Sequence, residues 1–166
     1  MSRVEIKKAC PGDEKILAYI QTESWKAAFC DILSEETLTR CTSIDKAEKM
    51  YESILQNQDI HMLIEYVDEK PHCIAAWSLN RNDLGEDVAE LVCIHSLCDN
   101  WNKGYGTIMM EYVLEEMKIA GYTKVILWVF EKNKSARSFY EKHRFVLTER
   151  RQEAVGEMEV MYLKTL

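Results

Sequence analysis

The stretch from Val88 to Gly121 contains the residues whose spacing is best suited to chemistry. An apolar run leads into Lys103-Gly104-Tyr105-Gly106-Thr107, and a helical pattern follows it. The first turn of a helix has unpaired N–H groups and the positive end of the helix dipole, and glycine lets an anion approach the backbone closely. The pattern therefore indicates a phosphate site, although a Gly-x-Gly turn that caps a helix for structural reasons is about as common.

Two familiar phosphate motifs do not account for this stretch. The third glycine of a dinucleotide-binding G-x-G-x-x-G motif would fall at Met109, and no G-x-x-x-x-G-K-(S/T) sequence occurs in the chain. The phosphate ligand must therefore be one that neither motif recognises.

A cluster of metal-type ligands, Cys93, His95 and Cys98, lies just before the glycines. In a strand, residues 93 and 95 would share a face, but no second ligand pair with zinc-like spacing occurs elsewhere. Nothing near Cys98 in the sequence is an obvious base to activate it as a nucleophile. We therefore expect neither a metal site nor an acyl-enzyme at these cysteines.

Composition limits the classes of function. With 166 residues, 47% of them hydrophobic, the chain is expected to form one domain over residues 1–166 with a full core. A net charge of −7, spread along the chain, argues against nucleic-acid binding. No run reaches the ~18 apolar residues of a membrane span, and no secretory signal is visible. The six cysteines contain no C-x-x-C pair and mostly fall in apolar runs, so we expect reduced thiols in a cytoplasmic protein.

Hydrophobic periodicity predicts the elements that must position the glycine-rich turn. Gly121 is expected to end the helix that follows the turn, and Ser34 to cap a second helical stretch that continues through Leu55. The expected strands are 4–8 at a sheet edge, 60–67, 73–79, 88–97, 124–130, 145–150 and 157–163, with a hairpin turn at 68–71. The expected helices are 13–29, the stretch after Ser34, 105–121 and 136–143. This order predicts an α/β fold with a mixed sheet flanked by helices on both faces.

Two segments together resemble the signature of the GNAT superfamily of N-acetyltransferases. The family's acetyl-CoA motif (R/Q)-x-x-G-x-(G/A) corresponds to Trp101–Gly106, and N-x-x-A-x-x-(F/L)-Y-x-(K/R)-x-G-F corresponds to Asn133–Phe145. Glu23–Phe29 is also similar to the first helix of many small bacterial members. The resemblance covers essentially the whole chain. It implies a single GNAT-like domain with a mixed, mostly antiparallel central sheet of about seven strands.

The resemblance also implies which residues would hold acetyl-CoA, with no metal. Asn133 corresponds to a family residue that hydrogen-bonds the pantetheine arm, and a helix N-cap is its structural alternative. The remaining residues implied to bind the cofactor, largely through the backbone, are Ile94, His95, Ser96 and Leu97 on the strand, and Asn102, Lys103, Gly104, Tyr105, Gly106 and Thr107 in the turn.

Two proton-transfer roles follow from the same resemblance. Tyr140 corresponds to a family tyrosine that lies near the CoA sulfur and protonates or orients the leaving thiolate; core packing is the alternative. Glu90 corresponds to a carboxylate that in some relatives is the general base, acting directly or through water; an exposed strand glutamate is the alternative.

Two residues depart from the family pattern. Trp101 stands where the family has Arg or Gln, which removes a side chain that helps to close the pyrophosphate loop. Arg144 stands where the family has Gly, at a helix-end turn in which Arg is disfavoured if φ is positive. Neither change removes a catalytic group.

We therefore expect transfer of acetyl from acetyl-CoA to a primary amine, small molecule or peptide, by direct attack in a ternary complex. A different acyl donor or acceptor is an alternative, and so is a catalytically silent CoA-binding or regulatory module. No motif in the sequence identifies the amine acceptor. The sequence also leaves open whether the chain forms a homodimer.

Overall fold

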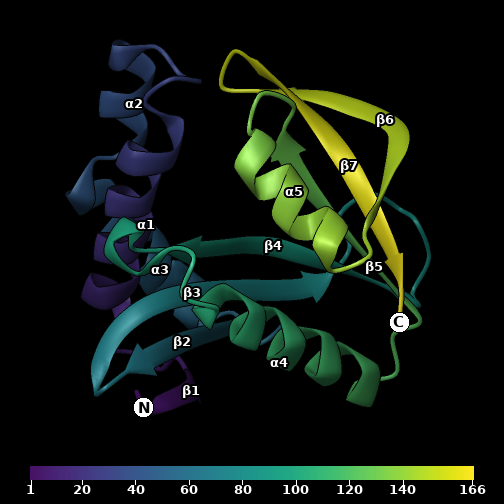
Figure 1. Ribbon diagram of the computed structural model, residues 1–166, viewed down its shortest axis with the longest axis horizontal. Helices are drawn as coiled ribbons and strands as arrows, with labels where there is room; N and C mark the ends of the chain where they lie inside the picture. The colour runs from purple at the N-terminus through teal and green to yellow at the C-terminus, as the bar shows by residue number, and fades with distance from the viewer.

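The computed structural model describes residues 1–166, and one seven-stranded sheet in the order β1-β2-β3-β4-β5-β7-β6 crosses it (Figure 1). The strands are β1 (Val4–Lys8), β2 (His61–Val67), β3 (Lys70–Leu79), β4 (Val88–Ser96), β5 (Lys124–Phe130), β6 (Val146–Ala154) and β7 (Glu157–Thr165). The helices are α1 (Glu14–Phe29), α2 (Glu35–Cys41), α3 (Ile44–Gln56), α4 (Tyr105–Ile119) and α5 (Lys134–Lys142), with a 3-10 turn over Cys98–Asn100. The expected α/β fold with a mostly antiparallel sheet is confirmed.

The sheet splits between β4 and β5, its only parallel pair. These two strands are paired at only three positions, from Val88 opposite Lys124 to Glu90 opposite Ile126. Beyond this point β4 continues along β3 as far as Ser96, and β5 continues along β7 as far as Phe130. β4 therefore stays paired with β3, and β5 with β7, along their whole remaining lengths. The carboxyl-terminal parts of β4 and β5 are not paired with each other, and no strand lies between them.

Helices cover the two faces of the sheet separately. Residues of α4 and α5, among them Val113 and Tyr140, pack with β3, β4, β5 and β7 in the largest core cluster. On the opposite face, Leu17 of α1 and Tyr51 of α3 pack against β2 and β3. Figure 1 shows α1, α2 and α3 grouped beside the half formed by β1 to β4, with α4 and α5 on the other side.

The prediction of one helical stretch from Ser34 through Leu55 is wrong. Ser34 does cap a helix, because its hydroxyl accepts a hydrogen bond from Thr37 N at 3.2 Å. That helix ends at Cys41. Ser43, whose backbone is extended, is the N-cap of the next helix, α3. Two adjacent hydroxyl residues, Thr42 and Ser43, interrupt the helix because such side chains favour caps over helix interiors.

Smaller differences concern turns and cysteines. The β2–β3 turn is shorter than expected, with Asp68 and Glu69 both at positive φ and β3 beginning at Lys70. Although most cysteines fall in apolar runs of the sequence, three of the six, Cys10, Cys30 and Cys98, are exposed. All six thiols are free. No helix is both long and apolar enough to cross a membrane.

Candidate cofactor and catalytic site

The glycine-rich turn forms a cradle of free backbone donors at the start of α4. Asn102 and Gly104 take positive φ values of 61° and 88°, which turn the chain into the helix. The backbone N–H groups of residues 102 to 107 donate to no acceptor within the protein. The helix dipole places a partial positive charge at this point. The arrangement fits an anion that binds through main-chain donors.

A network that sequence reasoning missed holds this turn in place. Lys103 Nζ donates to Asn100 Oδ1 at 2.9 Å, and Asn100 Nδ2 lies 3.4 Å from His72 Nδ1. The His72 ring, only 2% exposed on β3, packs edge-on against Tyr105 with centroids 5.4 Å apart. Burial, with a smaller effect of Lys103, lowers the pKa of His72 and keeps it neutral. No motif links His72 to the turn, because the two are brought together only by the sheet.

Trp101 closes the same turn in a way its family counterpart would not. Its indole Nε1 donates to the Ser96 carbonyl at 3.0 Å, which ties the turn to the end of β4. Leu97 N donates to the His72 carbonyl at 3.0 Å. Two of the backbone groups expected to bind cofactor, Ser96 C=O and Leu97 N–H, therefore have partners inside the protein.

The β4 residues Ile94 and His95 lie where β4 and β5 have separated. They pair with Ala75 and Ile74 on the β3 side, and neither pairs with β5. His95 accepts a hydrogen bond from Trp25 Nε1 at 3.5 Å, and burial lowers its pKa to about 4. The imidazole is therefore neutral, and its Nε2 atom is occupied by α1.

Tyr140 lies on the inner face of α5, over β4. It is 9% exposed and packs against Phe145 and Tyr162. Burial, with smaller effects of the Cys93 and Cys73 thiols, raises its pKa, so the hydroxyl stays protonated. That hydroxyl has no hydrogen-bond partner in the protein, yet it is not among the fully enclosed polar atoms. Tyr140 is thus a core residue whose hydroxyl still reaches solvent.

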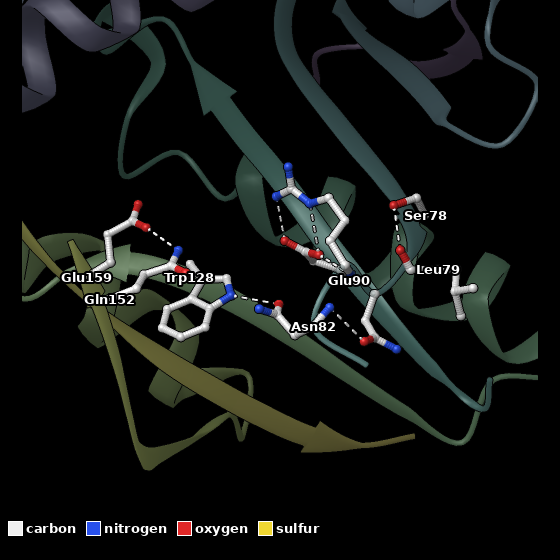
Figure 2. Close-up of polar contacts among 9 residues, drawn as sticks. Ser78, Leu79, Asn82, Glu90, Trp128, Gln152 and Glu159 are labelled. Carbon is white, nitrogen blue, oxygen red and sulfur yellow. Dashed lines mark hydrogen bonds and ion pairs between the residues drawn. The ribbon is translucent and has the colours of Figure 1, made fainter. Parts of the chain in front are cut away.

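Glu90 is the last residue at which β4 pairs with β5, and it is 1% exposed. The alternative of an exposed strand glutamate is therefore excluded. Its carboxylate accepts hydrogen bonds from Arg81 Nη2 at 2.6 Å, Arg81 Nε at 3.1 Å and the Arg81 backbone N at 3.0 Å. Figure 2 shows Glu90 with Ser78 on one side and Asn82 and Trp128 on the other. Sequence reasoning missed Arg81, since a loop arginine gives no sign of its partner.

The motif over α5 includes a helix cap at each end. Asn133 Oδ1 accepts from Ala136 N at 3.2 Å, so the N-cap interpretation holds, and the Asn133 amide nitrogen has no partner in the protein. At the other end, Arg144 takes φ of 65°. Arg144 N donates to Glu141 O at 2.9 Å and Phe145 N to Tyr140 O at 3.1 Å, which is the Schellman pattern.

The cysteine–histidine cluster does not converge. Cys98 is exposed and its thiol faces Asp99 at 3.7 Å, whereas Cys93 is partly buried under α1 and α3. No group of three or more histidine, cysteine, aspartate or glutamate side chains is arranged to hold a metal ion.

A sheet that opens between two parallel strands, beside a helix start with free N–H groups, has the features expected of a site for a phosphate-bearing ligand. The acetyltransferase (GNAT) family model matches residues 26–145, and the chain belongs to this family, whose co-substrate is acetyl-CoA. No curated protein matches the sequence.

Solved structures share the fold at low identity. PaiA N-acetyltransferase from Thermoplasma acidophilum, in complex with coenzyme A, is 21% identical over 99% of both chains, with a TM-score of 0.84. A GCN5-related N-acetyltransferase from Rhodopseudomonas palustris is 18% identical over 100% of this chain and 98% of that one, with a TM-score of 0.80. Ribosomal-protein-alanine N-acetyltransferase from Brucella melitensis is 15% identical over 98% and 99%, with a TM-score of 0.75.

Proposed function

We propose that the protein transfers acetyl from acetyl-CoA to a primary amine by direct attack in a ternary complex. Membership of the family supports acetyl transfer, and the names of two similar structures, the PaiA and the ribosomal-protein-alanine N-acetyltransferases, favour a nitrogen acceptor. The observation that carries the proposal is the run of free N–H groups at residues 102 to 107 beside the β4–β5 split. Acetyl-CoA supplies an activated thioester and a pyrophosphate that matches these donors.

The chain's own residues divide the binding task. The turn from Asn102 to Thr107 holds the pyrophosphate through main-chain donors, and Lys103 adds a positive charge there. The free edges of β4 and β5 offer backbone donors and acceptors to the amide-bearing pantetheine arm, which would lie as an extended segment in the split. The Asn133 amide nitrogen is a further donor to that arm. This geometry leads the thioester toward Tyr140 and Glu90, where the strands meet.

Two protons must be moved during the reaction. At pH 7 an amine of pKa ~10.4 is neutral in roughly one molecule in 10³, which corresponds to about 4–5 kcal/mol. A base must take that proton, and an acid must supply one to the thiolate leaving group. Tyr140 is the acid in this proposal, because its buried hydroxyl is protonated and has no competing acceptor.

Glu90 is the proposed base, and it acts through water. Its carboxylate is enclosed and already accepts three hydrogen bonds from Arg81. The two Arg81 side-chain nitrogens and its backbone N–H hold the carboxylate in one orientation at the closed end of the split. They also occupy its oxygens, so a direct bond to the amine would have to displace a donor. A water that bridges the amine and the carboxylate avoids that loss.

Two measurements test the proposal. Isothermal titration with acetyl-CoA, CoA and an ATP control should show binding of the first two only. Thiol release during incubation with acetyl-CoA and a panel of mono-, di- and polyamines and of peptides with free N-termini should identify an acceptor. Binding without turnover on any amine would support the silent CoA-binding module instead. Failure to bind acetyl-CoA or CoA would refute both functions.

A further inference from the structure

Two aromatic side chains of β5 lie beside the open part of the split, on the face of the sheet opposite α4 and α5. Leu127 and Val129 belong to the core beneath α4 and α5, so their neighbours Trp128 and Phe130 point to the opposite face. Both follow Ile126, the last β5 residue that pairs with β4. Because they are two residues apart on one strand, their Cα atoms are separated by about 7 Å.

Different neighbours hold these two rings. The indole Nε1 of Trp128 donates to Asn82 Oδ1 at 3.1 Å, which directs the ring toward the β3–β4 loop (Figure 2). The Phe130 ring instead packs edge-on against Phe29 of α1, with centroids 5.0 Å apart. The loop covers Glu90 at the closed end of the split, whereas the end of α1 contacts β4 at its open end. The two rings are therefore drawn in opposite directions along β5.

Helix α1 bounds the open end of the split on this face. Trp25 packs edge-on against Phe29, with centroids 5.0 Å apart, and against His95 of β4, with centroids 6.3 Å apart. Since Phe29 also contacts Phe130, a continuous row of four rings joins β4 to β5. Measured along β4, this row lies about 16 Å from Glu90. On this face the split is thus bounded at both ends, by the β3–β4 loop and by the row of rings.

The part of β4 between these two boundaries is accessible. The residues of Val88–Leu91 are buried, whereas those of Val92–Ser96 are each partly exposed, although β4 lies in the middle of the sheet. Trp128 is also partly exposed. Helices α4 and α5 occupy the other face, together with the proposed acetyl-CoA site. An acceptor that approaches from the opposite face therefore passes Trp128 and Phe130 before it reaches the thioester beside Glu90.

We propose that the acceptor is a primary amine at the end of an unbranched methylene chain, and that Trp128 and Phe130 select it by admitting such a chain between their rings. The inference rests on the proposed function and narrows its acceptor. A straight chain presents apolar CH₂ groups to both rings and carries its amine past them toward Glu90. A ring or branch at the nitrogen-bearing carbon is too wide for this passage, because one indole is fixed by Asn82 and the phenyl ring by Phe29. A free alkylamine and a lysine side chain share the selected chemistry.

The test compares acceptors of equal carbon number by thiol release. The wild-type protein should acetylate n-hexylamine with a kcat/KM about tenfold or more above that of cyclohexylamine and of the hexylamine isomer branched at the nitrogen-bearing carbon. Equal values for the three amines would overturn the inference while the proposed function stood. No turnover of any amine, with acetyl-CoA bound, would refute the proposed function and the inference with it.

Two peptides distinguish the sources of the chain. One carries an internal lysine and a blocked N-terminus, and the other has a free N-terminal alanine and no lysine. Faster acetylation of the lysine peptide than of n-hexylamine would assign the chain to a lysine side chain, and the reverse would assign it to a free alkylamine. Faster acetylation of the alanine peptide than of both would overturn the inference, because its amine lies on a branched carbon.

Variants of the two flanking elements test the selection itself. Trp128→Ala should remove most of the preference for n-hexylamine over cyclohexylamine. Asn82→Ala releases the indole, so it should raise KM for n-hexylamine several-fold with little change in kcat or in CoA affinity. Asn82→Asp keeps an acceptor for the indole N–H and should restore KM. Tyr112→Ala, which removes an exposed ring on α4, is the control and should behave like the wild type. Wild-type preference in Trp128→Ala, with CoA binding intact, would overturn the inference.

Discussion

Glu65 on β2 has a buried carboxylate to which no group of the protein donates a hydrogen bond. It is 0% exposed, and both of its oxygens are enclosed without a hydrogen-bond partner. It pairs in register with Ile6 on β1 and with Cys73 on β3. Burial raises its pKa from 4.5 to about 7, and the Cys73 thiol lowers it by a smaller amount. We predict that this one side chain makes the stability of the protein fall as pH rises.

The sign and size follow from the two protonation states. The folded protein holds the proton up to pH about 7, whereas the unfolded chain releases it near 4.5. The free energy of unfolding therefore decreases as pH rises between these values. One pKa unit corresponds to 1.36 kcal/mol, so the full loss is about 3 kcal/mol by pH 8. Glu65→Gln removes the titration while keeping the shape of the side chain. Relative to the wild type, this variant should gain about 3 kcal/mol between pH 4 and pH 8.

Urea denaturation at pH 4, 5, 6, 7 and 8 measures this gain. The comparison requires that the unfolding free energy fall with urea concentration at the same slope in both proteins. Comparing wild type with variant cancels other titrations, such as that of His95, which acts in the opposite direction at low pH because its pKa is lowered. Glu153→Gln, at an exposed position on β6, is the control and should run parallel to the wild type. Parallel curves for the wild type and Glu65→Gln would refute the reasoning.

Three further predictions concern the site. Tyr140→Phe should lower kcat roughly 10²-fold with little change in CoA affinity, measured by thiol release and titration, and normal turnover would make Tyr140 purely structural. Gly104→Val should weaken CoA binding at least tenfold, whereas Gly121→Val, with a similar positive φ and equally open surroundings, should lose stability but not affinity. Glu90→Gln should lower kcat roughly 10²-fold with little change in CoA affinity if Glu90 is the base, because the amide cannot accept the proton; near-normal turnover would point to another base.

Sequence patterns correctly predicted the features that depend on residues close together in the chain. The strands, the helix after the glycines and the cap at Asn133 each depend on residues a few positions apart, and the structure contains them all. The strained turn was also predictable, because replacing glycine at the end of α5 leaves Arg144 at positive φ. The break between α2 and α3 was missed, since a continuous apolar stripe can extend across two helices. The cue was the Thr42-Ser43 pair, which favours caps.

Side-chain contacts between residues that are far apart in the chain could not be predicted from the sequence. Glu90 is enclosed by Arg81 because a long β3–β4 loop folds back over the strand, and no spacing rule specifies where such a loop goes. His72 supports the turn through Asn100 for the same kind of reason. In both cases the sequence separation is large and the side chains are of ordinary type. The catalytic assignments therefore stay predictions, although the structure supplies the neighbours on which their chemistry depends.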